Sequence, residues 1–226
     1  YPGTPSTEIF ENLPQYKEDI YSEWAPNEKV ALEAAYGAAI AGERSLCAMK
    51  HVGLNVAADP MFTAAYLGVN GGFVIITADD PDLHSSQNEQ DSRFYARSAH
   101  VPMLEPADSA ECREYVMRAF EISEKYDTPV MLRLVTRIAH ARSLVEEGAR
   151  QEIPLKDYEK DIKKYVMMPG NAKRRHPVVE QRLRDLTAWA ETAEINCAEP
   201  GTDHSRGILT SSTSYQYVKE VCGDRY

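Results

Sequence analysis

The sequence lacks the short motifs that identify several common classes of ligand-binding enzyme. A Walker phosphate loop, a GxGxxG turn, an HExxH pair and a GxSxG elbow are all absent. The usual signatures of P-loop NTPases, Rossmann dinucleotide binders, zincin proteases and α/β-hydrolases are therefore missing. Function has to be sought in single polar residues at the ends of strands and the starts of helices.

Cysteine is scarce as well. The four cysteines, Cys47, Cys112, Cys197 and Cys222, include no CxxC pair. This spacing excludes a zinc ribbon or a ferredoxin-type iron–sulfur motif in these residues. Cys47 lies in an apolar, strand-like run and Cys112 in an expected helix, so we predict that both are reduced thiols in the core.

Positive charge and long apolar runs are also limited. The chain has 25 Lys and Arg against 35 Asp and Glu, a formal net charge of −10. Because a protein that binds the phosphate backbone normally has a basic surface, nucleic acid is not expected as a partner. No apolar run approaches the roughly 20 residues that span a bilayer, and no signal peptide is visible. We therefore expect a cytoplasmic globular protein that does not contact a membrane.

Apolar strand-like runs and helices alternate between residues 45 and 140. Strands are expected at 45–50, 71–79, 101–106 and 129–140. Helices are expected at 27–43 and from Asp108, where Glu111 completes an approximate capping box. Residues 51–68 are expected to form a turn and then a helix that is interrupted near Pro60. This alternation predicts an α/β fold with a mostly parallel sheet and helices on both faces. Ligands bind such sheets at the carboxyl ends of the strands, here the loops at 50–55 and 79–97.

The two ends of the chain have a different character. Thr4 is expected to cap a short helix at 7–14, with Pro5 at its first position. From about residue 143 the sequence is charged, which indicates a linker with a surface helix at 177–193. GILTSS is expected to form a strand that begins another domain. The predicted domains are therefore 1–142, 143–206 and 207–226.

Two polar positions at the predicted ligand edge each have two interpretations. Glu28 heads the Ala-rich helix, where a carboxylate either complements the helix dipole or shares a proton with a heterocyclic nitrogen. Lys50 and His51 lie at the end of a strand. His51 either relays a proton or has a structural role, in which it caps the next helix or bonds to a backbone carbonyl.

The acidic stretch DDPDLHSSQNEQDSR is interpreted as a solvated loop that covers substrate, because its spacing matches no EF-hand. Arg97 lies beyond this loop. Its guanidinium either grips a substrate carboxylate or pairs with Asp79 or Asp91.

Five blocks, in order, resemble the alpha subunit of the indolepyruvate ferredoxin oxidoreductases, within the thiamine diphosphate-dependent 2-oxoacid:ferredoxin oxidoreductases. They are YPGTPST, NEKVALEAAYGAAIAG, MKHVGLNVAADP, ADDPDLHSSQNEQDSRFYAR and ILTSSTSYQYVKE. MKHVGLN and DDP…HSSQNEQDSR are similar to the arylpyruvate branch, whereas YPxTPS and the Ala- and Gly-rich helix headed by Glu28 resemble the wider superfamily. The resemblance covers nearly the whole chain and implies a pyrimidine-binding domain whose first strand is expected before Tyr1.

The resemblance also implies roles for single residues. Glu28 matches the glutamate that hydrogen-bonds N1′ of the aminopyrimidine. Gly53 and Asn55 are expected to bind the cofactor with Glu28, and His51 to act beside Glu28 in catalysis. Three residues are expected to contact the substrate. Thr4 matches a threonine that lies beside the substrate in relatives, and Arg97 matches an arginine that binds the carboxylate of the 2-oxoacid. Lys50 is also expected to contact the substrate. No metal ligand is assigned.

The implied cofactor is thiamine diphosphate with Mg²⁺, of which these residues would hold the pyrimidine half. The GDG…N motif for the diphosphate and the cysteine clusters for [4Fe–4S] centres are absent and are expected elsewhere in the complex. The complete enzyme would convert an arylpyruvate and coenzyme A into an aryl-acyl-CoA and reduce ferredoxin. The expected partners are a diphosphate-binding domain, the beta (gamma-type) subunit and a second copy in a homo-oligomer, and the chain alone is expected to be inactive.

Two alternatives stay open from the sequence. The first is the alpha subunit of a pyruvate or 2-oxoglutarate ferredoxin oxidoreductase. The second is a non-catalytic domain kept for assembly, because the Ala- and Gly-rich helix would also suit a subunit interface.

Overall fold

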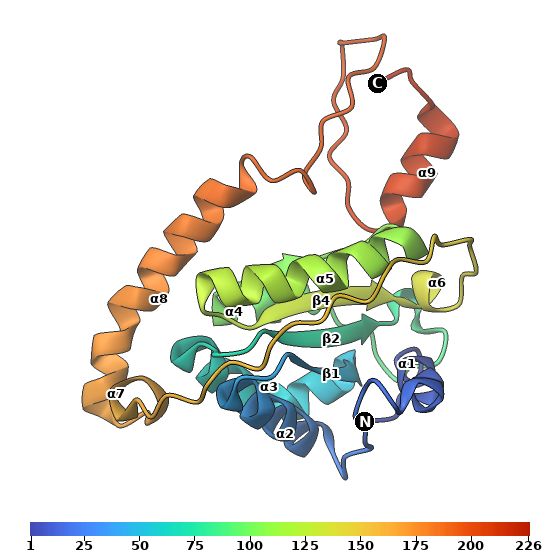
Figure 1. Cartoon of the computed structure of the whole chain (residues 1–226). Coiled ribbons are helices and arrows are strands. Elements are labelled where there is room, and N and C mark those ends of the chain that lie inside the picture. The colour runs from blue at the N-terminus through green and yellow to red at the C-terminus, as the bar shows by residue number, and fades with distance from the viewer.

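The computed structural model describes residues 1–226 and contains one four-stranded sheet (Figure 1). The strands lie in the order β1-β2-β4-β3, and every pairing is parallel. The α/β prediction is confirmed, and all four strands end at one edge, which we call the carboxyl edge. The strands are β1 (Ser45–Lys50), β2 (Phe73–Asp79), β3 (Met103–Leu104) and β4 (Val130–Val135).

The two faces of the sheet carry separate hydrophobic cores, because neighbouring strand residues point to opposite faces. Met49 and Ile75 share a core with helices α2, α3 and α4 on one face. Val74 and Leu132 share a core with α5 on the other face. Figure 1 shows the sheet between these layers. The helices are α2 (Glu28–Ala41), α3 (His51–Leu67), α4 (Arg93–Ala99) and α5 (Ser109–Tyr126).

Side chains cap both α2 and α5, and the cap of α5 was predicted. The Asn27 side chain caps α2 by accepting a hydrogen bond from the Val30 N–H at 3.0 Å. Asp108 caps α5 by accepting from the Glu111 N–H at 2.9 Å. Glu111 in turn accepts from the Ala107 N–H at 2.7 Å, so the approximate capping box forms.

The prediction of a turn and an interruption in 51–68 is wrong. Helix α3 begins at His51, directly after β1, and continues through Pro60 to Leu67. Proline costs roughly 3 kcal/mol inside a helix. Leu54 and Ala57 before Pro60, and Met61 and Ala64 after it, are all 0% exposed. Burial of apolar residues on both sides of the proline therefore keeps the helix continuous.

The prediction that Thr4 caps the first helix is also wrong. Helix α1 (Thr7–Asn12) begins at the predicted residue, but Ser6 and not Thr4 is at the N-cap position, and a 3₁₀ helix (Leu13–Tyr16) follows it. The hydroxyls of this segment hold a turn instead. The Ser6 hydroxyl donates to the Gly3 carbonyl at 2.8 Å, and the Thr7 hydroxyl accepts from the Gly3 N–H at 2.8 Å.

The charged segment after β4 docks on the molecule more extensively than predicted. The surface helix, expected at 177–193, begins eight residues earlier because Pro169 suits the first helical position. Figure 1 places α7 at the edge of the sheet opposite to the strand ends, which we call the amino edge. The helices after β4 are α6 (Thr136–Ala139), α7 (Ile162–Tyr165), α8 (Pro169–Ala190) and α9 (Thr213–Cys222).

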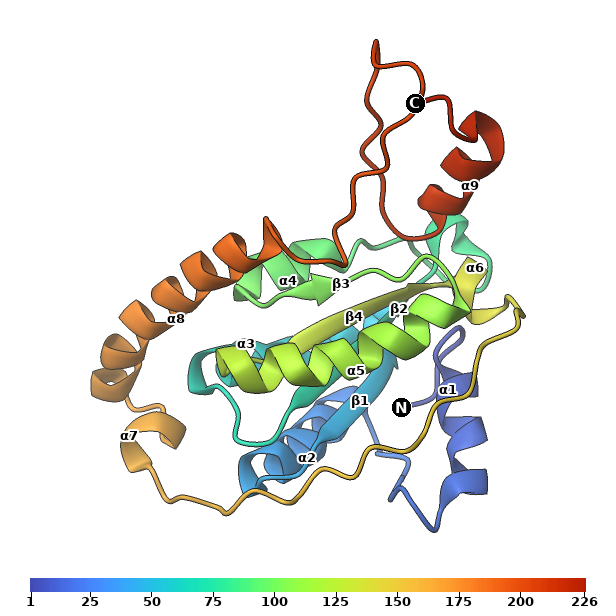
Figure 2. The same cartoon turned by 45° about the horizontal axis from the view of Figure 1, so that its top comes forward.

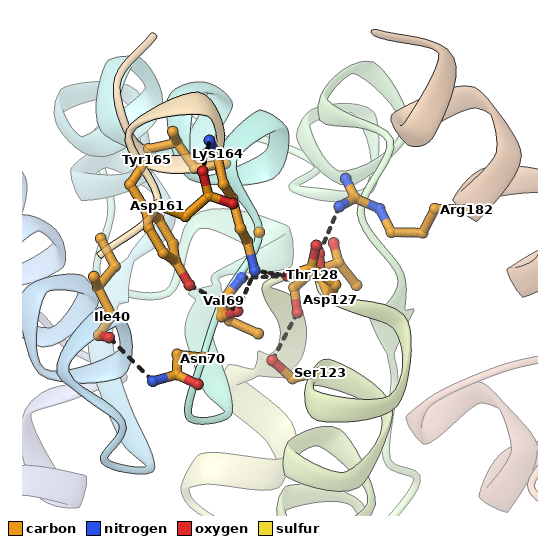
Figure 3. A network of polar contacts seen from close by, with 12 residues as sticks. Ile40, Val69, Asn70, Ser123, Asp127, Thr128, Asp161, Lys164, Tyr165 and Arg182 are labelled. Carbon is orange, nitrogen blue, oxygen red and sulfur yellow. Dashed lines mark hydrogen bonds and ion pairs between the residues drawn. The ribbon is translucent and has the colours of Figure 1, made fainter. Parts of the chain in front are cut away.

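The amino-edge cluster consists of Asp127, Lys164, Arg175 and Arg182. Figure 3 shows Asp127, Lys164 and Arg182. Asp127 Oδ1 accepts from Lys164 Nζ at 2.8 Å, and Oδ2 accepts from the Arg175 guanidinium at 3.1 Å. Arg182 is buried and donates to the carbonyls of Asp127 and Ala65, and burial lowers the pKa of its guanidinium to about 10.

These three cations lie at the C-terminal ends of α3 and α5, where the helix dipole is negative and backbone carbonyls lack helical partners. Arg175 also donates to the carbonyls of Tyr66 and Leu67, the last residues of α3. The amino-edge cluster therefore holds α7 and α8 against the sheet domain.

The predicted strand GILTSS does not form. Figures 1 and 2 both show the segment before α9 extending away from the sheet, and Leu209 is 102% exposed. Without a neighbouring strand its backbone has no ladder partner, so it stays irregular. The end of this segment and α9 both touch the sheet domain: Ser211, just before α9, donates to Glu105 at 3.1 Å, and Gln216 of α9 donates to Asp108 at 3.1 Å.

Candidate active site at the carboxyl edge

Glu28 and Gly53 are in direct contact at the carboxyl edge. Glu28 is the first residue of α2 and half-buried, and Gly53 is buried in the first turn of α3. A Cβ atom added at Gly53 would lie 2.5 Å from Glu28 Cγ and 2.6 Å from its Oε1. Only glycine leaves room for the carboxylate to lie over the helix backbone. Two residues expected to bind the cofactor are therefore placed together.

His51 is fully buried at the start of α3, with 0% of its surface exposed. Its Nε2 lies 3.2 Å from the Asn88 carbonyl oxygen, which agrees with the interpretation of a bond to a backbone carbonyl. Because a carbonyl can only accept, Nε2 carries the hydrogen and Nδ1 carries the lone pair. Nδ1 is buried without a partner. A buried unpaired acceptor is costly, so it marks a position where a ligand would be favoured.

Lys50 and Asn55 flank these residues and both have partners. Lys50 precedes α3, and its Nζ donates to the Ser85 carbonyl at 2.9 Å. Asn55 is exposed, and its side-chain oxygen accepts from the Tyr95 hydroxyl of α4. The start of α3 is thus bonded both to the loop of residues 80–92 and to α4.

Thr4 lies beside this group on the N-terminal segment. The Tyr1 nitrogen donates to the Ala48 carbonyl of β1 at 3.1 Å. A Cβ added at Gly3 would lie 3.1 Å from Lys50 Cβ. The turn that contains Thr4 therefore crosses the end of β1, and Thr4 itself is half-buried.

Arg97 is exposed on α4, and its side chain forms no hydrogen bond or ion pair with the other candidates. The alternative that it pairs with Asp79 or Asp91 is wrong, because other arginines take both acids. Arg133 Nε lies 2.6 Å from Asp79, and Arg93 lies 2.8 Å from Asp91.

Sequence reasoning missed two buried carboxylates at the end of β2. Asp79 and Asp80 are both 0% exposed. Asp79 accepts from Arg133 Nε at 2.6 Å and from the Ser92 hydroxyl at 2.5 Å. The sequence contained a signal for these buried acids, because both directly follow a continuous apolar run. Such a run is typical of a strand that is buried on both faces.

The two best-formed surface hollows lie away from the predicted site residues, and the structure has no cluster of metal-binding side chains. Two surface hollows of about 400 and 470 Å³ lie beside α8, and no predicted site residue lines either of them. No three His, Cys, Asp or Glu side chains come together in a way that would hold a metal ion. None of the helices combines the length and apolar character that crossing a bilayer requires.

Comparison with solved structures and family models identifies this parallel sheet with its flanking helices as a thiamine diphosphate-binding fold. The 2-oxoglutarate:ferredoxin oxidoreductase of Magnetococcus marinus has this fold, with a TM-score of 0.66 at 16% identity over 90% of this chain and 44% of that one. The family model described as "Pyruvate flavodoxin/ferredoxin oxidoreductase, thiamine diP-bdg" matches residues 1–196, and the chain belongs to this family.

Two curated relatives are much closer in sequence. Indolepyruvate oxidoreductase subunit IorA of Methanothermobacter thermautotrophicus is 45% identical over 225 residues, which cover 98% of this chain and 36% of the relative. The subunit of the same name from Archaeoglobus fulgidus is 42% identical over 229 residues, covering 98% of this chain and 37% of the relative. The chain therefore spans about a third of the length of these relatives.

Proposed function

We propose that the chain is part of a subunit of a thiamine diphosphate-dependent oxidoreductase that oxidatively decarboxylates arylpyruvates such as indolepyruvate. The product would be an aryl-acyl-CoA, and ferredoxin would accept the electrons. The observation that carries this proposal is the difference in identity among relatives. Identity is 42% and 45% to the two indolepyruvate oxidoreductase subunits over 98% of the chain. It is 26% to 2-oxoglutarate synthase subunit KorA and to ketoisovalerate oxidoreductase subunit VorB, over 68% and 58% of the chain.

The carboxyl edge fits the aminopyrimidine part of thiamine diphosphate. Glu28 has the space above Gly53 that a Cβ would fill, and His51 Nδ1 is a buried acceptor without a partner. When bound, thiamine diphosphate supplies the carbon nucleophile and the electron sink for decarboxylation. The residues in this chain would hold and tune the ring.

Each candidate has a proposed role in this site. Glu28 shares a proton with the ring nitrogen that it faces, and His51 accepts a hydrogen bond through Nδ1. Gly53 and Asn55 complete the cofactor contact. Thr4 and Lys50 contact the 2-oxoacid from the N-terminal segment and the end of β1. Arg97 binds the substrate carboxylate only if α4 faces the substrate in the complex.

The remaining parts of the site are proposed to come from outside these residues. They are the diphosphate-binding domain with its Mg²⁺, the beta subunit, and the [4Fe–4S] centres that lead to ferredoxin. We infer a cytoplasmic homo-oligomer made of such subunits, with domains at 1–142, 143–206 and 207–226. The isolated chain would be inactive for this reason.

A substrate panel on the full-length complex tests the proposal. Indolepyruvate, phenylpyruvate, pyruvate and 2-oxoglutarate would each be assayed with coenzyme A and a viologen dye. A kcat/KM at least tenfold higher for the two aryl substrates is expected. A preference for pyruvate or 2-oxoglutarate would move the chain to the corresponding alternative branch.

The assembly alternative rests on the exposed face of α2. Ala34, Gly37 and Ala41 are exposed there, and nothing lies within 4 Å of a Cβ added at Gly37. A complex that binds no thiamine diphosphate and reduces no dye with any of the four substrates would favour this second function.

A further inference from the structure

Asp80 fastens the loop of residues 80–92 to the sheet through hydrogen bonds from Ser85, Ser86 and Thr136. Its Oδ2 accepts from the Ser85 N–H at 2.8 Å and from the Ser86 hydroxyl at 2.5 Å. Its Oδ1 accepts from the Thr136 hydroxyl at 2.5 Å. Thr136 follows β4 directly, so this one carboxylate joins the loop to the ends of two neighbouring strands.

The carboxylate of Asp80 is charged at neutral pH. Burial by itself would raise its pKa. The hydrogen bonds from Ser86, Thr136 and Ser85, together with the charge of Lys50, outweigh burial and hold the pKa of Asp80 well below its usual range. Hydrogen bonds to a charged acceptor are about twice as strong as neutral ones, so the loop is held firmly at residues 85 and 86.

The same short stretch of loop holds the start of α3. The Ser85 carbonyl accepts from Lys50 Nζ at 2.9 Å, and the Asn88 carbonyl lies 3.2 Å from His51 Nε2. Residues 85–88 therefore accept hydrogen bonds from Lys50 and His51 of the candidate site, and Asp80 holds the same stretch through Ser85 and Ser86. A continuous chain of contacts runs from Asp80 to the His51 ring.

The contact between the Asn88 carbonyl and His51 Nε2 decides which ring nitrogen of His51 is the acceptor. While the Asn88 carbonyl faces Nε2, that nitrogen must carry the hydrogen and Nδ1 must be unprotonated in the neutral ring. If the loop moved and released Nε2, the hydrogen could reside on either nitrogen. The buried Nδ1 would then no longer be a fixed acceptor.

We propose that Asp80 is a positioning residue that, through residues 85–88, holds His51 in the tautomer whose Nδ1 accepts a hydrogen bond from an N–H or O–H group of the bound ligand. The identity of that ligand rests on the proposed function, whereas the tautomer does not. Asp80 touches no ligand in this proposal and acts only through the loop.

The tautomer can be measured without any turnover. Solid-state NMR of the full-length complex, with ¹⁵N-labelled histidine, separates protonated from unprotonated ring nitrogens, and the His51→Gln variant identifies the signals of His51. We expect Nε2–H and a bare Nδ1 in the wild type. In Asp80→Ala and in Ser86→Ala, which is the milder change, we expect a mixture of tautomers.

Kinetics supply the second readout. Asp80→Ala should lower kcat about 10- to 100-fold on whichever 2-oxoacid is turned over, as expected for a misplaced catalytic group. In the His51→Gln background the same change should cost less than about threefold, because coupled residues are not additive. Asp80→Asn should recover most of the activity, since its amide can keep the bonds to Ser86 and Thr136. The exposed loop variant Asp82→Asn is the control and should match the wild type.

The outcomes separate this inference from the proposed function. A complex that turns over no 2-oxoacid refutes the proposed function, and the NMR result still decides the inference. A wild-type signal for Nδ1–H, or unchanged tautomer signals in both Asp80→Ala and Ser86→Ala, overturns the inference that Asp80 positions His51. Fully additive losses in the double variant also overturn it.

Discussion

The carboxylate of Glu28 lies over the backbone of Gly53, so close that a Cβ at position 53 would be 2.6 Å from Oε1. This contact joins the first turns of α2 and α3, which are consecutive helices on one face of the sheet. Glycine at this position is therefore a requirement of the site and a cost to the helix, because glycine is unfavourable inside a helix.

Gly53→Ala should change activity and stability in opposite directions. The new methyl group displaces the flexible Glu28 side chain, so we expect turnover by the full-length complex to fall at least about tenfold. The free energy of unfolding should stay equal or rise by up to about 1 kcal/mol, because alanine favours the helix. Gly37→Ala is the matched control in α2, since nothing lies within 4 Å of its added Cβ. It should gain the stability and keep the turnover. Loss of stability without loss of turnover in Gly53→Ala would contradict the assigned contact.

Glu28→Gln keeps the size of the side chain and replaces the ionisable carboxyl group with an amide that cannot act as a general acid or base. We expect kcat to fall about 100-fold or more, within the usual range for a lost general acid or base. Binding of thiamine diphosphate, followed by its circular dichroism in the complex, should weaken much less. Glu33→Gln, an exposed carboxyl of the same helix, should leave both quantities unchanged. If Glu28→Gln turns over at the wild-type rate, Glu28 serves only the helix dipole.

Asp80 should make the stability of the protein depend on pH under acidic conditions. Hydrogen bonds and the charge of Lys50 outweigh burial and lower the folded-state pKa of Asp80 below the unfolded value of about 3.9. Its contribution is therefore complete above about pH 4 and decreases as the pH falls toward the folded pKa. Urea unfolding of the full-length subunit between pH 7 and pH 3 should show this loss in the wild type. The slope below pH 4 should be smaller in Asp80→Asn, and an equal slope would mean that other acids dominate.

Asp127→Ala should loosen α7 and α8 without disturbing the carboxyl edge. The change removes the shared partner of Lys164 and Arg175 in the amino-edge cluster, so we expect a loss of roughly 1–3 kcal/mol. Hydrogen exchange of residues 162–190 should become faster, while exchange in 85–92 stays the same. Asp185→Ala, an exposed acid on α8, is the control. Equal protection of α8 in Asp127→Ala would show that the arginine–carbonyl bonds suffice.

Local pattern alone predicted the elements that are regular in sequence. β1 was expected at 45–50 and forms over Ser45–Lys50, and the helix expected at 27–43 forms over Glu28–Ala41. Their apolar periodicity and capping residues are local properties, so no knowledge of neighbours was needed. The family was also recognisable from motif blocks that lie along the chain in order.

The wrong predictions for 51–68 and for GILTSS share one physical cause, which is dependence on distant partners. Pro60 suggested an interruption because its cost is local, while the burial that offsets it involves the sheet and α2. GILTSS has the composition of a strand but finds no neighbour to pair with. The charged surface helix forms as predicted, but its docking was not foreseen, because its cations pair with helix ends and an acid that are far away in sequence.

The amino-acid sequence by itself determined the alternation of strands and helices, the candidate residues and the family, because these depend on residue type and spacing. Only the tertiary structure decided that Glu28 meets Gly53, that Asn88 selects the tautomer of His51, and that Asp80 holds the loop between them. These contacts join residues 25, 37 and 56 positions apart along the chain, counted from Glu28 to Gly53, His51 to Asn88 and Asp80 to Thr136. Parallel strands bring such positions together at one edge, and no local pattern specifies which of them will touch.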